Sequence, residues 1–413
     1  MPPVGTARDP RTARSQRRTP RTRAAGLLLL VTALAATACS GGGGSGAGAS
    51  KAGGTVKIGL LASLSGTYQA VGTDLRDGFQ LYLDAHGGQL GGHPVDLVVA
   101  DEGDGAPTAL PAATKLVKQD KVVAMTGIVG AGSVAAVSPL LTESRIPLVS
   151  SNGRPVVKDV SRQWSTSFLS NEPGSAIAQY VHDTVQGPVF AIGPDYQGGW
   201  DELQGFTDAF VKAGGQLANP GGKTLFTPFP ATTDFTPYLT QIKNSHAKAV
   251  YCFYAGGAAV DFVKQYAQSD VRDVPLYAAG FLTEGGVLNA QGDAAKGIRS
   301  VLNYAPDLDN ATNRTFVSAW QAKHPGPPTT YAMASYDAAA VLDKAIAAAG
   351  TDVTPERINN AIAGLGQIDS PRGTWQFGKN THSPVQKWYL RQVKSDGRTL
   401  SNLTVQDLAT IGN

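Results

Sequence analysis

A glycine-rich turn, Gly127-Ile-Val-Gly-Ala-Gly-Ser133, is the part of this sequence whose residue types and spacing best suit chemistry. A short apolar run precedes the turn, a segment with helical apolar spacing follows it, and a second apolar run comes next. Strand, glycine turn, helix and strand make a βαβ unit, in which the turn directs backbone N–H groups to the space above the sheet. Such groups bind anions. The sequence therefore predicts an anion site at Gly130, Ala131, Gly132 and Ser133.

The same turn also fits the dinucleotide-binding pattern G-x-G-x-x-A, from Gly130 to Ala135. In that motif the turn follows the first strand, and an acidic residue lies about 20 residues further on. Here the turn follows the third expected strand, and Asn152 and Gly153 stand where the acid should be. Dinucleotide binding is therefore the weaker interpretation of this turn.

Charge and motif content argue against several other function classes. The formal charge is +3, but residues 1–38 hold seven arginines and one acid, which leaves 28 basic and 31 acidic residues elsewhere. That balance has no basic bias toward nucleic acid. The six histidines are scattered without a metal-ligand pair, and there is neither a G-x-S-x-G elbow nor a P-loop. We expect no catalytic residue, no metal site and no cofactor.

The N-terminus has the pattern of an export signal. An arginine-rich head precedes the apolar segment 24–38, which is shorter than the roughly 20 residues that span a bilayer. Ala36-Thr-Ala-Cys39 resembles the lipobox of bacterial lipoproteins, although Ala36 stands where leucine is usual. We expect 1–38 to be a signal peptide, Cys39 to be lipidated, and 39–54 to be a Gly/Ser tether. A chance cysteine in an ordinary signal and a twin-arginine signal at Arg17-Arg18 are the alternatives.

Apolar runs alternate with helical patterns along the remaining chain, which predicts an α/β fold with parallel doubly wound sheets. A length of 413 residues favours two lobes over one. Cys252 lies in an apolar run and is predicted to be a core residue. Strands are predicted at 56–61, 95–100, 146–151, 189–193, 249–254 and 276–279, helices at about 74–85, 108–119 and 331–349, and a β-rich tail at 374–377 and 385–393.

Two short motifs leave alternatives open. Asp101-Glu-Gly-Asp104 looks like the start of a calcium loop, but Gly103 occupies a ligand position and no glutamate closes the loop, so we expect a solvated turn. The string Gly-Gly-Gln-Leu occurs at 87–90 and again at 214–217. It indicates either two related lobes or simply two helix ends that each lead into a strand.

At this point an ordered set of strings resembles the lipoprotein solute-binding components of ABC importers, in the branch of the leucine/isoleucine/valine-binding protein. The strings cover nearly all of residues 55–395: VKIGLLASLSG (56–66), the unit at 127–152, FYAGGAAVDFVKQYA (253–267), YAAGFLTEGG (277–286), YAPDLDNATNRTF (304–316), ASYDAAAVLDKA (334–345), SPRGTWQF (370–377) and HSPVQKWYLRQV (382–393).

The resemblance implies two Rossmann-like lobes with parallel-rich central sheets, joined by three hinge crossings and closing on a small ligand. The N-terminal lobe would comprise 55–170 plus 303–381, and the C-terminal lobe 171–302 plus 382–413. It also implies an envelope-anchored monomer that delivers an amino acid or a related organic or aromatic acid to ABC permease subunits. The alternative is a sensory protein that presents its ligand to a membrane receptor.

The resemblance further implies which residues hold the ligand carboxylate. The loops matching Gly130–Ser133 and Ser150–Asn152 would bind it through backbone N–H groups and a hydroxyl, so Ser133, Ser151 and Asn152 are candidates. Ser133 would also serve as the helix N-cap, a role that could be its only one. The family's usual serine lies at Ala131 or Gly132, so we expect the backbone contacts more firmly than the side-chain contact.

The remaining candidates follow other strands. Ser65 and Tyr68 match a pocket-wall position, although a plain turn explains this loop equally well. In the second lobe the candidates are Asp195 and Tyr196, and Ala255 stands where leucine-binding members carry an aromatic residue.

Two candidates lie later in the chain. Glu284 lies near the position of the acid that pairs with a ligand ammonium group; Asp195 could serve instead, and a surface role for Glu284 is the alternative. Tyr331 aligns with a pocket aromatic.

Overall fold

The structure of this protein is a computed structural model that describes residues 54–413, which belong to one compact unit of the chain. The predicted signal peptide, Cys39 and all but the last residue of the predicted tether lie outside the described residues. Within 54–413, no helix has both the length and the apolar character needed to cross a membrane.

The first sheet has six strands in the order β2-β3-β1-β4-β5-β6. All neighbours pair in parallel except β2 and β3, which form an antiparallel hairpin at the edge. Its strands are β1 (Val56–Ala62), β2 (Gln89–Leu90), β3 (His93–Asp101), β4 (Ala124–Gly127), β5 (Leu148–Ser150) and β6 (Gln163–Ser165).

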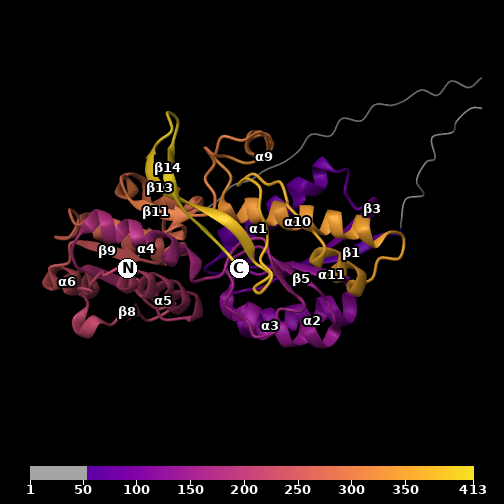
Figure 1. Cartoon of the computed structure of the whole chain (residues 1–413), viewed down its shortest axis with the longest axis horizontal. Helices are drawn as coiled ribbons and strands as arrows, with labels where there is room; N and C mark the ends of the chain where they lie inside the picture. Colours follow the sequence, from indigo (N-terminus) through magenta and orange to yellow (C-terminus); the bar gives the residue numbers. More distant parts are fainter. Residues whose placement is uncertain (1–53) are drawn as a thin grey trace, which may run out of the picture. The chain divides into compact units, whose positions relative to one another are not determined.

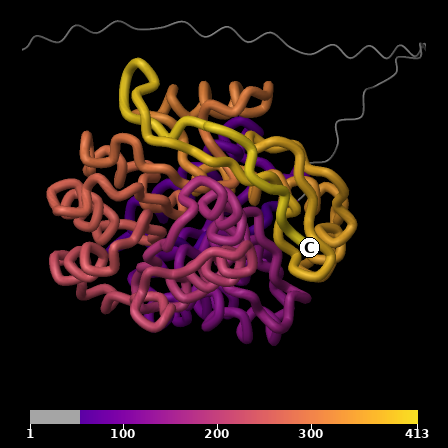
Figure 2. Tube along the Cα trace, turned by 60° about the vertical axis from the view of Figure 1, so that its left-hand side comes forward, coloured from indigo at the N-terminus to yellow at the C-terminus, as the bar shows by residue number. Residues whose placement is uncertain are grey.

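The second sheet has the order β12-β13-β11-β10-β9-β7-β8, with β14 paired to β13. Strands β7 to β11 pair in parallel, and the last three strands add antiparallel pairs. The strands are β7 (Val189–Pro194), β8 (Leu225–Thr227), β9 (Ala249–Cys252), β10 (Leu276–Ala279), β11 (Arg299–Leu302), β12 (Gln376–Phe377), β13 (Pro384–Ser395) and β14 (Leu400–Ile411). In Figures 1 and 2 the yellow β13–β14 hairpin runs from a projecting tip back to the C-terminus.

The parallel strands of the two sheets follow the same order. Numbered along the chain within each sheet, they run second, first, third, fourth, fifth: β3-β1-β4-β5-β6 and β8-β7-β9-β10-β11. Each sheet is therefore a doubly wound unit with a topological switch point beside its first strand, where ligands bind in such folds. This repeat supports the interpretation of the two Gly-Gly-Gln-Leu strings as parts of related lobes.

Helices cover both faces of each sheet (Figure 1). Helices α1 and α10 pack on one face of the first sheet, with α11 beside α10, and α2 and α3 pack on the other. The second sheet has α4 and α5 on one face and α6 and α7 on the other. The helices are α1 (Gln69–Ala85), α2 (Ala106–Lys115), α3 (Ala131–Ser144), α4 (Glu172–Val185), α5 (Gln197–Lys212), α6 (Thr236–Ser245), α7 (Gly256–Gln268), α8 (Gly286–Gln291), α9 (Ala311–Gln321), α10 (Thr330–Ala349) and α11 (Pro355–Ala363).

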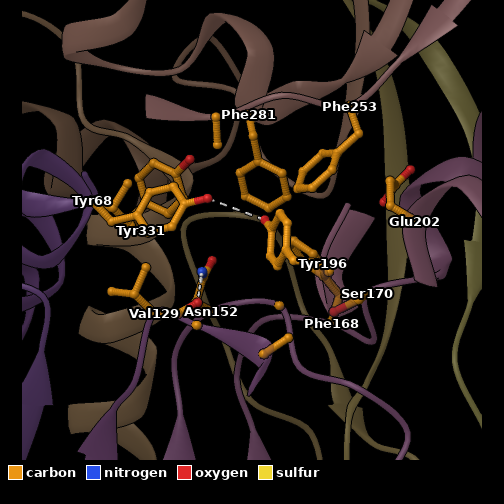
Figure 3. Close-up of a pocket in the computed structure, with 16 residues that line it drawn as sticks. Tyr68, Val129, Asn152, Phe168, Ser170, Tyr196, Glu202, Phe253, Phe281 and Tyr331 are labelled. Atoms are coloured by element: carbon orange, nitrogen blue, oxygen red, sulfur yellow. Dashed lines mark hydrogen bonds between the residues drawn. The ribbon is translucent and has the colours of Figure 1, made fainter. Parts of the chain in front are cut away.

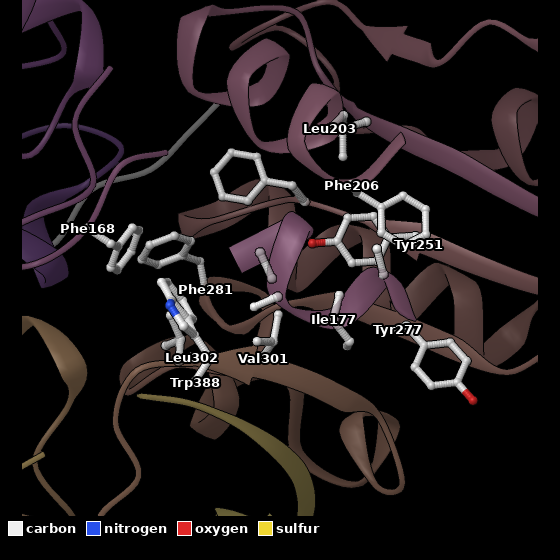
Figure 4. Close-up of a cluster of buried hydrophobic side chains, with 14 of the residues drawn as sticks. Phe168, Ile177, Leu203, Phe206, Tyr251, Tyr277, Phe281, Val301, Leu302 and Trp388 are labelled. Atoms are coloured by element: carbon white, nitrogen blue, oxygen red, sulfur yellow. The ribbon is translucent and has the colours of Figure 1, made fainter. Parts of the chain in front are cut away.

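Successive side chains of a strand point to opposite faces of the sheet, so each buried strand contributes to two separate layers of the core. In β9, Ala249 and Tyr251 belong to the cluster under α4 and α5, whereas Val250 and Cys252 belong to the cluster under α6 and α7. Figure 4 shows the first of these clusters, with Tyr251 packed under α5. Cys252 is fully buried, so its predicted core role is confirmed.

The predicted α/β class, two-lobed organisation and most predicted strands are confirmed. Helix α1 begins at Gln69 rather than near residue 74, because its first turn already packs Val71 into the core. The chain passes between the two sets of elements after β6 and after β11, close to the predicted crossings, and for the third time before β12, a few residues ahead of the predicted boundary. The lobe boundaries at residues 170, 302 and 381 stay predictions.

A buried polar network joins these crossings. The Gln386 side-chain amide donates to the Ser167 carbonyl at 2.7 Å, and its oxygen accepts from the Asn303 amide at 2.9 Å. Arg372 lies beside this group, with its Nη2 2.6 Å from Asp337 Oδ2 on α10. The guanidinium also donates to Gln386 Oε1 and to the Thr166 carbonyl. Segments from all three crossings therefore share one hydrogen-bonded cluster.

Asp337→Asn should destabilise the protein strongly. The Arg372 and Asp337 side chains are only 2% and 1% exposed, so the variant leaves a buried guanidinium without its counter-charge. We expect a loss of about 3 to 5 kcal/mol in the free energy of unfolding, measured by urea denaturation.

Asp270→Asn is the matched control for this measurement. Lys243 and Asp270 lie at the same 2.6 Å separation, but their side chains are 57% and 74% exposed. Screening by water should limit the loss to less than about 1 kcal/mol. Equal losses in the two variants would contradict the role assigned to the buried pair.

Candidate functional site

A cavity lies where loops from the carboxyl ends of both sheets meet, and its empty space is about 520 Å³, part of it open to solvent. The switch-point loops of both sheets contribute to its wall, as the doubly wound topology requires. The lining residues are Tyr68, Val71, Val129, Gly130, Ala131, Asn152, Gly153, Phe168, Ser170, Tyr196, Gly198, Glu202, Phe253, Ala255, Phe281 and Tyr331.

Six aromatic side chains dominate this wall (Figure 3). Phe281 lies at the centre of the group, with its ring centroid 5.7 Å from that of Tyr331 in a stacked arrangement. The rings of Phe168 and Phe253 each lie 5.6 Å from Phe281, and Tyr196 lies 6.3 Å from Phe253. Such edge-to-face and stacked rings form a surface suited to a flat apolar ligand.

The two lobes contact each other directly at the cavity. The Tyr68 hydroxyl donates to the Tyr196 hydroxyl across the lobes at 3.4 Å, the dashed line in Figure 3. The Phe229 ring lies 4.5 Å from Tyr196 and 6.2 Å from Tyr68, centroid to centroid. Burial raises the pKa of Tyr196 to about 12, so its hydroxyl keeps its proton at neutral pH. The arrangement is that of a closed cleft.

The glycine turn that suggested an anion site already holds a carboxyl group of the chain itself. Glu102 is 1% exposed, and its two oxygens accept from the Val129 N–H at 2.6 Å and the Gly130 N–H at 2.8 Å. Burial raises the pKa of Glu102, although these hydrogen bonds act in the opposite direction. The predicted solvated turn at 101–104 is therefore wrong at Glu102, because this side chain points inward to the start of α3.

The start of α3 also differs from the prediction. The helix begins at Ala131 with Gly130 in an extended conformation as N-cap, so Ser133 is the third helical residue and not the cap. A serine cap is not needed there, because Glu102 already accepts from the N–H groups of Val129 and Gly130, just before the helix. The N–H groups of Ala131, Gly132 and Ser133 lie in the first turn, where no carbonyl four residues earlier in the helix can accept from them.

Seven of the predicted ligand-binding residues line the cavity, and their binding role stays a prediction. They come from the loops after β1, β4, β5, β7 and β9 and from the first turn of α10. The seven are Tyr68, Gly130, Ala131, Asn152, Tyr196, Ala255 and Tyr331.

The other predicted residues do not line the cavity. The Ser65 hydroxyl donates to Asp101 at 2.6 Å, and the Asp195 carboxylate accepts from the Trp200 indole at 2.8 Å. Gly132 is exposed, whereas Ser133 and Ser151 are buried beneath the wall.

Glu284 is 4% exposed and is not a surface residue. It lies 3.0 Å from the buried Arg391 guanidinium and accepts from the Thr330 N–H at 2.8 Å. Its charge is therefore already paired inside the protein.

Several wall residues were not predicted from the sequence. Phe253 is the first residue after β9, and Phe281 is the second residue after β10. Ligands in such folds bind beyond the carboxyl ends of the strands, so a search for aromatic residues just after each strand would have found both. Phe168 follows β6, a short strand that the sequence pattern did not reveal. Glu202 lies within α5, and nothing in its sequence context marks it.

The electrostatics of the cavity come from backbone dipoles more than from side-chain charges. No lysine, arginine or histidine is among the lining residues of the described chain, and Glu202 is the one acid. Helices α3, α5 and α7 begin at Ala131, Gln197 and Gly256 beside the cavity, so each turns its partially positive N-terminus toward it. This arrangement can hold a small anion at its edge while the rings enclose an apolar body.

Glu202 controls part of the pH dependence of stability. Burial raises its pKa from 4.5 to about 8, despite hydrogen bonds from the Tyr251 hydroxyl and the Gly174 N–H that favour the carboxylate. The folded protein then holds this proton more tightly than the unfolded chain, so the free energy of unfolding should fall as pH rises from about 5 to about 8.

Glu202→Gln removes this titration. The free energy of unfolding should then fall less steeply with pH, by roughly 1.4 kcal/mol per pH unit inside that window. Urea denaturation at several pH values measures the effect, with Glu143→Gln at an exposed position on α3 as control. Parallel curves for the wild type and Glu202→Gln would show that Glu202 does not titrate in this way.

Comparison with known proteins agrees with this fold. A family model described as periplasmic binding protein matches residues 55–398. The Leu/Ile/Val-binding protein homolog 6 of Brucella melitensis biotype 1 is 29% identical over 371 residues, covering 87% of this chain and 93% of the relative.

Two solved structures are also similar. A solute-binding protein of an ABC transporter from R. palustris, in complex with benzoate, is 32% identical with a TM-score of 0.79, over 87% of this chain and 98% of that one. A second one from R. palustris, in complex with 4-hydroxybenzoate, is 28% identical with a TM-score of 0.78, over 86% and 97%. The resemblance inferred from the ordered sequence strings is thus confirmed, and the chain belongs to the periplasmic binding protein family.

Proposed function

We propose that this protein is the extracytoplasmic solute-binding lipoprotein of an ABC importer, and that it captures a small aromatic carboxylate between its two lobes. The observation that carries the proposal is a cavity with six aromatic side chains and three adjoining helix N-termini, and with no basic side chain among the described residues of its wall. A benzoate-like molecule has the matching parts: a flat apolar ring and one carboxylate. The similar R. palustris proteins with benzoate and 4-hydroxybenzoate support this ligand class.

The carboxylate would lie at the first lobe. Gly130, Ala131, Asn152 and Gly153 line the cavity there, and the first turn of α3 offers N–H groups that Glu102 does not occupy. Backbone donors at a helix start bind a carboxylate without a buried cation. The ring would extend from this edge into the space between Phe281, Tyr331 and Tyr196.

An α-amino acid fits less well. Its ammonium group needs an ionised acid in the cavity, and Glu284 and Asp195, the predicted partners, do not line it. Glu284 is paired with Arg391, and Asp195 with the Trp200 indole. Glu202 does line the cavity, but its raised pKa favours the protonated form at neutral pH. These contacts favour an aromatic acid over a branched-chain amino acid.

Capture requires no chemistry on the ligand. The wall combines Tyr68, Val129 and Asn152 of one lobe with Tyr196, Phe253 and Phe281 of the other, so a bound ligand contacts both lobes. A ligand that contacts both lobes binds the closed state more tightly than the open state and shifts the population toward closure. The closed form would then dock on the permease. Cys39, once lipidated, would keep the protein at the outer face of the membrane.

Aromatic carboxylates should raise the thermal transition of the purified protein. A ligand present at 100 times its Kd adds about 2.7 kcal/mol of stability, which a thermal-shift assay detects readily. Benzoate is the first probe, with benzamide as the matched neutral control that lacks the carboxylate. A shift with leucine and none with any aromatic acid would contradict the proposal.

Gly256→Ala should weaken ligand binding by hindering closure. A Cβ at Gly256 would lie 2.8 Å from the Thr67 carbonyl oxygen of the other lobe. The apparent affinity for the ligand falls in proportion to the population of the closed state. We therefore expect isothermal titration calorimetry to show about tenfold weaker binding.

Gly292→Ala is the matched control for this variant. Both glycines have φ of +57°, but a Cβ at Gly292 would meet nothing within 4 Å. Both variants place alanine at a positive φ and should lose stability from backbone strain, about 1 to 3 kcal/mol. Only Gly256→Ala should lose affinity, and equal affinities would argue against closure at this contact.

A sensory protein that hands its ligand to a membrane receptor would have the same cavity. Deletion of the gene in the source organism separates the two functions. Loss of uptake of the aromatic acid would support transport. Normal uptake with loss of a cellular response to the acid would support sensing.

A further inference from the structure

Glu202 is a polar group in the aromatic cavity that the binding of a simple carboxylate does not use. It lies in the second turn of α5, is 1% exposed, and lines the cavity. Figure 3 shows it near Phe253, on the side of the cavity opposite Tyr68 and Tyr331. Burying an acid in an aromatic wall lowers the stability of the protein. Such costly groups occur mainly at functional sites, so Glu202 is a candidate for a role in ligand binding.

The contacts of Glu202 hold the carboxyl group in one place. The Tyr251 hydroxyl donates to Oε1 at 2.5 Å. Tyr251 is itself fully buried and stacks on Phe206 with ring centroids 3.8 Å apart. On the other side the backbone of α4 comes close, since a Cβ at Gly174 would lie only 2.9 Å from Oε1. Together with the hydrogen bond from the Gly174 N–H, these contacts hold the carboxyl group beside the cavity.

No cation neutralises this carboxyl. Among the described residues no lysine, arginine or histidine forms an ion pair with Glu202. Burial raises its pKa to about 8, so at neutral pH it carries a proton. A neutral carboxyl can both donate and accept a hydrogen bond. A ligand hydroxyl group has the same two capacities, whereas the bare edge of a benzene ring has neither.

We propose that Glu202 binds a hydroxyl group on the ring of the ligand, so that the ligand class is a hydroxylated aromatic acid and not the unsubstituted acid. The inference rests on the proposed function, because it takes an aromatic carboxylate as the ligand. The carboxylate lies at the start of α3, and the ring passes between the aromatic side chains. Glu202 then makes the second polar contact and determines specificity.

The comparison of benzoate with its three monohydroxy isomers tests this in the wild-type protein. Isothermal titration calorimetry should show at least one isomer binding about tenfold or more tightly than benzoate, as a buried hydrogen bond requires. Glu202→Met, similar in length but apolar, should remove this preference, so that the three isomers bind no more tightly than benzoate does to the same variant. Glu202→Gln keeps both hydrogen-bonding capacities and should retain the preference. Thermal unfolding checks that each variant is folded.

The outcomes are distinguishable. Equal affinity for benzoate and for every isomer in the wild type would overturn the inference but leave the proposed function standing. A preference that persists in Glu202→Met would also overturn it. If Glu202→Met does not fold, the affinities of the wild-type protein for benzoate and its three isomers still test the inference. If none of the four acids binds to folded wild-type protein, the proposed ligand class fails, and this inference fails with it.

Discussion

The buried ion pair between Arg372 and Asp337 is the constraint that the two-lobed arrangement depends on. Neither side chain is accessible to water, so the guanidinium must find its hydrogen-bond acceptors within the protein. Those partners include the Thr166 carbonyl and Gln386, and Gln386 in turn contacts Ser167 and Asn303. The three segments that join the lobes are thereby held in one geometry. A cleft can close reproducibly only if its hinge is defined in this way.

The cavity follows from the repeated strand order. Because both sheets follow the same doubly wound order, the carboxyl ends of their parallel strands meet across the gap between the lobes. The loops there place six aromatic rings around a space with no lysine, arginine or histidine in the described wall. Helix starts supply the partial positive charge, so an anion can be bound without a buried cation. Rings and dipoles together favour a flat carboxylate.

Two buried acids near the cavity have different environments. Glu102 accepts two backbone N–H groups at the start of α3 and takes the place that an external anion would otherwise fill. Glu202 accepts from the Tyr251 hydroxyl and the Gly174 N–H, and it lines the aromatic cavity. The first acid therefore shapes the proposed carboxylate site, and the second lines the cavity. Both appear in the sequence as ordinary glutamates, without a motif that separates them.

The sequence by itself determined the fold class, most of the parallel strands and the family, because strand and helix periodicities and ordered strings are local properties. Seven of the residues that it predicted line the cavity, and their binding role stays a prediction: six follow strands (Tyr68, Gly130, Ala131, Asn152, Tyr196 and Ala255), and Tyr331 lies in the first turn of α10. Only the tertiary structure decided the rest. Glu102, which follows β3, accepts from the N–H groups just before α3, and Glu284 is paired with Arg391 from the far end of the chain. Such contacts join residues distant in sequence, and no local pattern encodes which polar group finds which partner once water is excluded.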